Sequence, residues 1–70
     1  MDQTKIGKFI AEMRKEQNLT QQDLAEKLGI SNKTISKWEC GNGMPDYAVM
    51  ESLCSVLNIN VNELLSGERL

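Results

Sequence analysis

"LTQQDLAEKLGISNKTISKWE", from Leu19 to Glu39, carries the most informative residue pattern in the chain. Thr20 is a favourable helix N-cap, and a carboxylate stands three residues later in the capping-box position. Gly29 separates two short helical segments, because glycine readily adopts the left-handed conformation that ends a helix. Ser31 caps the second segment, which we expect to run from Asn32 to Glu39.

The two segments carry the pattern of a pair of helices that cross closely. Ala25 lies in the middle of the first, where a larger side chain would hold the helices apart. A tight turn at Gly29 swings the second helix away at a steep angle. Ile35 and Trp38 are three residues apart and fix the second helix by one face. The opposite face collects four polar side chains at i and i+4 spacing, namely Asn32, Lys33, Ser36 and Lys37.

The rest of the chain also has helical periodicity. A first apolar face comprises Ile6, Phe9, Ile10 and Met13, and a later one comprises Val49, Met50, Leu53, Cys54 and Leu57. Asp46 is expected to cap the fourth helix, and Asn60 with Glu63 opens a short fifth helix. We therefore predict an all-α fold of five short helices around one core. We expect residues 1–70 to form a single domain whose helix-turn-helix occupies residues 20–39.

Composition excludes several classes of protein. The chain of 70 residues has a net charge of −2, no histidine and only two cysteines, so we expect no metal site, no cofactor and no enzymatic activity. No apolar run approaches the roughly 20 residues of a membrane span. We expect Cys40 and Cys54 to be free thiols in a reducing cytoplasm. The acidic charge is concentrated in residues 46–70, which hold one Lys or Arg against four Asp or Glu.

The stretch resembles the helix-turn-helix of phage repressors, the Cro/CI family, also called the xenobiotic-response-element (XRE) family. The similarity covers residues 6–66 and rests on seven positions: Leu24, Ala25, Leu28, Gly29, Ile30, Ile35 and Trp38. The resemblance implies a compact, lambda-repressor-like DNA-binding domain. It also implies a transcriptional regulator, expected to be a repressor, that inserts the helix Asn32–Glu39 into a major groove about 12 Å wide.

The resemblance also assigns roles to individual residues. The expected base readers are Asn32, Lys33, Ser36 and Lys37, since Asn can pair with adenine and Lys with guanine. The expected phosphate contacts are Thr20, Gln21, Ser31, Thr34 and Asn42, and Ser36 matches either role. Gln21 is also expected to brace the recognition helix. Gly41 to Gly43 match a loop that meets the DNA backbone in relatives, but this chain has no Lys or Arg between Lys37 and Arg69.

Two further expectations concern contacts between elements. Arg14 and Glu39 match an ion pair that links the first helix to the end of the third. We expect it to be partly exposed and to orient the helix, since such pairs contribute about 0–1 kcal/mol. By analogy with the family, we expect a homodimer on an inverted-repeat operator, with contacts near Asn58 to Glu63. The free protein is expected to be a monomer, because no large apolar stripe is evident.

One alternative remains open from the sequence. The acidic last third and the loop without cations favour a protein-binding module on the same fold, such as an antitoxin-like partner. Salt dependence separates the two functions, because a DNA binder releases counterions and loses affinity linearly with log salt concentration.

Overall fold

The computed structural model describes all 70 residues as five α-helices without any strand. The helices are α1 (Gln3–Glu16), α2 (Gln21–Leu28), α3 (Asn32–Glu39), α4 (Tyr47–Leu57) and α5 (Val61–Ser66). The predicted all-α fold of five helices is confirmed, and α3 has the expected bounds. None of the five is long and apolar enough to cross a lipid bilayer.

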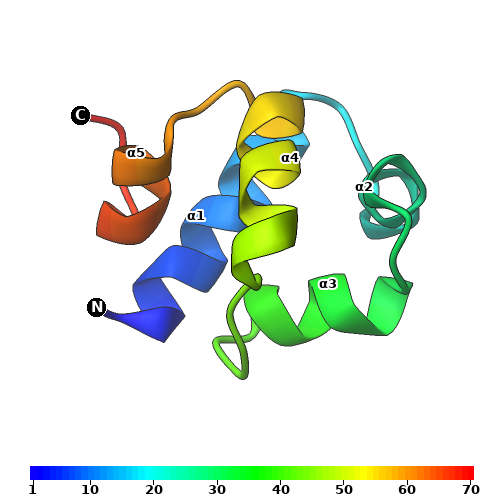
Figure 1. Ribbon diagram of the computed structural model, residues 1–70, viewed down its shortest axis with the longest axis horizontal. Coiled ribbons are helices and arrows are strands. Elements are labelled where there is room, and N and C mark those ends of the chain that lie inside the picture. The colour runs from blue at the N-terminus through cyan, green and yellow to red at the C-terminus, as the bar shows by residue number, and fades with distance from the viewer.

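The helices are arranged around α1 and α4, which cross at the centre of the molecule (Figure 1). α1 packs against α3, α4 and α5, whereas α2 packs against α3 and α4. α5 lies on one side of α4, and α2 with α3 lies on the other (Figure 1). Both chain ends lie on the α5 side, so neither end covers the α2–α3 pair (Figure 1).

The core consists of side chains from all five helices. Its twelve buried residues are Ile6, Phe9, Ile10, Met13, Leu24, Ala25, Ile35, Trp38, Leu53, Cys54, Leu57 and Leu64. The predicted α1 face is confirmed, because each of its four residues is at most 4% exposed. Val49 and Met50, which we expected in the core, pack against its edge and are half-buried, and Ile30 does the same.

Side-chain caps set where the helices begin. Thr20 and Asp23 form the predicted capping box of α2: the Thr20 hydroxyl accepts from the Asp23 N–H at 3.0 Å, and the Asp23 carboxylate accepts from the Thr20 N–H at 2.9 Å. Asn60 and Glu63 form an equivalent box at α5. These boxes satisfy amide groups that a helix start leaves without partners.

Gly7 brings the backbones of α1 and α3 into contact. A Cβ at this position would lie 2.2 Å from the Trp38 carbonyl oxygen and 3.0 Å from that of Glu39. Only glycine fits there, so Gly7 sets how closely the end of α3 approaches α1. The role of Gly7 was not predicted from the sequence, although a glycine inside a helical pattern often marks a close approach.

Candidate nucleic-acid interface

The outer face of α3 is polar and accessible, as the spacing predicts. Asn32, Lys33 and Lys37 are exposed, while Ser36 is half-buried. On the inner face Ile35 is 0% exposed and Trp38 is 5% exposed. The structure thus brings the four predicted base readers together on a helix that is fixed to the core by its other side.

The turn before α3 is tight and well bonded. Gly29 has φ 68° and ψ 32°, which is the predicted left-handed conformation. The amide groups of Gly29 and Ile30 both donate back to α2, the latter to the Ala25 carbonyl at 3.0 Å. Because these bonds tie the turn to the last turn of α2, the two helices keep one relative orientation.

The start of α3 presents free donors. The Ser31 hydroxyl accepts from the Thr34 N–H at 3.2 Å and lies 3.0 Å from the Thr34 hydroxyl. The N–H groups of Asn32 and Lys33 donate to no backbone carbonyl. Free amides at the positive end of a helix dipole attract anions such as phosphate.

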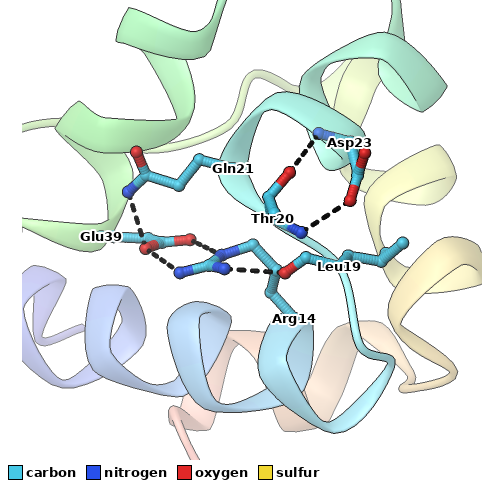
Figure 2. Close-up of polar contacts among 6 residues, drawn as sticks. All are labelled: Arg14, Leu19, Thr20, Gln21, Asp23 and Glu39. Atoms are coloured by element: carbon cyan, nitrogen blue, oxygen red, sulfur yellow. Dashed lines mark hydrogen bonds and ion pairs between the residues drawn. The ribbon is translucent and has the colours of Figure 1, made fainter.

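A network of polar side chains joins α3 to α1 and α2 (Figure 2). Arg14 donates from Nε to Glu39 Oε2 at 2.6 Å and from Nη2 to Glu39 Oε1 at 3.0 Å. Its remaining nitrogen, Nη1, donates to the Leu19 carbonyl at 2.8 Å. Gln21 donates from Nε2 to Glu39 Oε1 at 3.0 Å. The Glu39 carboxylate therefore holds residues from two other helices at the end of α3.

The predicted ion pair is present, but the expectation that it is partly exposed is wrong. The side chains of Arg14 and Glu39 are only 10% and 8% exposed. The hydrogen bonds that Arg14 donates to the Glu39 carboxylate raise the pKa of Arg14, against the opposing effect of burial. In such a setting, removal of one partner leaves an uncompensated buried charge, which costs far more than the loss of an exposed pair.

The loop after α3 lies close to that helix. The Asn42 N–H donates to the Lys37 carbonyl at 2.8 Å, and the Asn42 side chain is exposed. Gly41 has φ 76°, and a Cβ there would lie 3.1 Å from the Thr4 Cα in α1. The loop is therefore held between α3 and α1 while Asn42 faces solvent.

The sequence is similar to known regulators over nearly its whole length. It is 41% identical over 61 residues to the HTH-type transcriptional activator BcrR of Enterococcus faecalis, covering 87% of this chain and 30% of that protein. It is 35% identical over 60 residues to the cryptic phage CTXphi transcriptional repressor RstR of Vibrio cholerae, covering 86% of this chain and 54% of RstR. The chain thus spans less than two thirds of either relative.

A solved structure shows the same fold. The restriction-modification controller protein C.AhdI from Aeromonas hydrophila superposes with a TM-score of 0.81 and 27% sequence identity, covering 90% of this chain and 96% of C.AhdI. The helix-turn-helix domain family matches residues 7–70. This match includes the turn at Gly29 and both helices that flank it. The chain therefore belongs to the helix-turn-helix domain family, in agreement with its resemblance to phage repressors.

Proposed function

We propose that the protein is a transcriptional regulator that binds double-stranded DNA in a sequence-specific manner and reads the major groove with α3. The observation that carries this proposal is the two-sided character of α3. Its inner face is fixed by Ile35, Trp38 and the buried Glu39, whereas its outer face is exposed and cationic. A reading helix needs this combination, because base contacts require a defined position.

In this proposal the outer face of α3 divides into readers and anchors. Lys33 and Lys37 donate to guanine O6 and N7, and Asn32 pairs with adenine. Ser36 makes a shorter contact with a base edge. Ser31 and Thr34, together with the free amides at the start of α3, bind phosphate on one side of the groove.

Gln21 and Thr20 anchor a second phosphate at the start of α2. Gln21 donates one N–H of its side-chain amide to Glu39, which leaves the other N–H of that amide free to bind a phosphate. It would thereby join phosphate binding to the position of α3. Asn42 offers its side-chain amide to the DNA backbone at the opposite end of the reading helix.

Two copies bind an inverted-repeat operator in this proposal. Tyr47, Met50, Glu51 and Val61 line a shallow apolar groove between the starts of α4 and α5. Tyr47 is 92% exposed and Val61 is 40% exposed, so one patch offers both a projecting ring and a recess. A two-fold dimer needs such a self-complementary patch. The patch is small, which favours a monomer in free solution and a dimer on DNA. Residues 1–70 would form a single domain of such a regulator, which would act in the cytoplasm.

The test begins with selection of an operator from random DNA. Affinity is then measured for Lys33→Ala, Lys37→Ala and Gln21→Ala on a panel of single-base operator variants at several salt concentrations. Each lysine variant should relax preference at particular base pairs, by about 1–3 kcal/mol, and flatten the salt slope by up to about one unit. Gln21→Ala should weaken binding about equally on all sequences and barely change the slope, because Gln carries no charge.

Lys27→Ala serves as the matched control, since Lys27 is an exposed lysine on α2 outside the proposed contact set. It should leave the base preference unchanged. If the lysine variants in α3 lose affinity uniformly, the outer face anchors DNA without reading it. If no variant changes DNA binding, the assignment fails and the face belongs to the rival function, a protein-binding module.

A further inference from the structure

We propose that Asn42–Gly43 is a spontaneous deamidation site, whose conversion to a carboxylate weakens DNA binding. It is the one Asn-Gly dipeptide among the 70 residues. Asn42 is exposed in the loop between α3 and α4, outside any helix. The chemistry at Asn42 is independent of the proposed function, whereas its effect on DNA binding rests on that function.

The reaction needs only the chain and water. The backbone nitrogen of Gly43 attacks Cγ of the Asn42 amide, so that an N–Cγ bond forms and the Cγ–Nδ2 bond breaks. Ammonia leaves with the proton that the Gly43 nitrogen loses, and a five-membered succinimide remains. One water then opens the ring at either carbonyl and yields aspartate or isoaspartate. Overall, an amide and water become a carboxylic acid and ammonia, without oxidation or reduction.

The attacking nitrogen is accessible in this loop. The Gly43 N–H donates to no backbone carbonyl. A Cβ at Gly43 would have only one neighbour within 4 Å, the Trp38 Cδ1 at 3.9 Å. Glycine also leaves the backbone free to rotate toward the Asn42 side chain, because it lacks the steric restrictions that a Cβ imposes.

Other asparagines are less favourable. The amide after Asn18 is bonded, since the Leu19 N–H donates to the Arg14 carbonyl at 3.1 Å. The amide after Asn58 is bonded as well, since the Ile59 N–H donates to the Cys54 carbonyl at 3.0 Å. A bonded N–H must first leave its acceptor, and Leu or Ile crowds the approach. These sites act as internal controls within the same molecule.

The new carboxylate would lie where the segment has no compensating cation. No Lys or Arg occurs between Lys37 and Arg69. A negative charge at residue 42 would therefore oppose the DNA phosphates directly. Isoaspartate would also insert one methylene between the Cα of residue 42 and the Gly43 nitrogen, and so shift the loop that follows Asn42. Both products would weaken the contact with the DNA backbone that is proposed for Asn42.

The experiment incubates the purified full chain in mildly alkaline buffer at physiological temperature. Samples taken over time are analysed by peptide mass spectrometry and by isoaspartyl methyltransferase labelling, and their affinity for the selected operator is measured. Gly43→Ala is incubated in parallel, because a Cβ there meets only ordinary van der Waals contact. Asn42→Asp supplies the aspartate product directly, and its melting midpoint reports whether it is folded.

We expect acid to accumulate at residue 42 of the wild type, ahead of Asn18 and Asn58, while operator affinity falls in step. Gly43→Ala should keep its starting affinity throughout. Asn42→Asp should bind about five-fold more weakly than fresh wild type at low salt, with a smaller difference at high salt.

Absence of acid at residue 42, or its appearance at Asn18 and Asn58 to the same extent, would overturn the assignment of the site. Full affinity of folded Asn42→Asp and of deamidated wild type would overturn the effect on DNA binding. If fresh wild type binds no DNA, the proposed function fails together with that effect, while the mass analysis still decides whether the site exists.

Discussion

Gly29 and Gly7 restrict substitution for different physical reasons. At Gly29 the backbone has φ 68°, but a Cβ would meet nothing within 4 Å. Gly29→Ala should therefore cost only the backbone strain, about 1–2 kcal/mol, and Gly29→Asn should cost less because Asn tolerates this conformation better. Urea denaturation of the two variants measures the difference. Equal stability of wild type and Gly29→Ala would contradict the strain.

The sign of the stability change caused by Gly7→Ala tests whether α1 and α3 must approach each other closely. Alanine in place of glycine inside a helix ordinarily stabilises by about 1 kcal/mol. Here the added carbon would lie 2.2 Å from a backbone carbonyl oxygen, so we expect a net loss of about 1–3 kcal/mol. Lys8→Ala, an exposed change on the same helix, should have little effect. A more stable Gly7→Ala would show that α3 moves away freely.

These two glycines also show what local sequence can and cannot predict. The conformation of Gly29 was predictable, because helix ends are decided by the residues beside them. The role of Gly7 depends on Trp38 and Glu39, far along the chain, and no local pattern carries that information. The same holds for the ion pair: its partners came from the family resemblance, but its burial came only from the packed structure.

The link between α1 and α3 can be tested with a double replacement. Glu39→Leu alone would leave Arg14 buried without its partner and should cost about 3–5 kcal/mol, enough to unfold much of a small domain. Arg14→Met combined with Glu39→Leu should recover most of that stability. Denaturation of both single variants and the double variant gives the coupling energy. A double variant no more stable than the Glu39→Leu single variant would contradict this account.

The double variant should nevertheless bind DNA less well than wild type. It lacks the Glu39 carboxylate, which accepts a hydrogen bond from Gln21 Nε2 at 3.0 Å. The start of α2 is therefore no longer bonded to the end of α3. Stability and binding would then separate, which is the signature of a positioning role. Wild-type affinity in the folded double variant would show that core packing alone orients α3.

The capping boxes of α2 and α5 should contribute to acid sensitivity. Backbone N–H groups lower the pKa of Asp23, through Thr20, and that of Glu63, through Asn60 and Leu70. Since both carboxyls have a lower pKa in the folded chain, their stabilisation is present above the ordinary carboxyl range. It is lost as the pH falls through the folded values.

Asp23→Asn combined with Glu63→Gln should therefore flatten the fall in stability below about pH 4. Urea midpoints of wild type and the double variant, followed as a function of pH, measure this effect. Parallel curves for the two proteins would show that other carboxyls dominate acid unfolding.

Assembly of two copies on DNA should depend on the apolar groove beside Tyr47. Tyr47→Glu places charge on the proposed dimer patch and should reduce cooperative binding to the full operator, while affinity for an isolated half-site stays unchanged. Footprinting on operators whose half-sites are about one helical turn apart, ~34 Å, measures the cooperativity. Ser55→Glu, an exposed change elsewhere on α4, controls for added charge. Unchanged cooperativity in Tyr47→Glu would place the dimer contact elsewhere.

Sequence periodicity predicted the helices and the outer face of α3 well, but it could not predict this groove. Met50 was predicted on the inner face of α4, yet it also lines the groove beside Tyr47. Tyr47 is 92% exposed, because the short α5 begins beside it without covering it. Which apolar side chains stay exposed depends on how long the helices are and how they cross one another. Sequence periodicity carries no information on either.

The shared carboxylate of Glu39 has a consequence for motion. Helix ends usually fray, and their amides exchange with solvent by local opening. The end of α3 is different, because Arg14 holds Glu39 by two hydrogen bonds and the Gly7 backbone lies against the same turn. Opening this turn requires α1 to release it, so amide hydrogen exchange at Trp38 and Glu39 should approach the rate set by global unfolding. The helix proposed to read DNA would then be among the last parts of the molecule to loosen.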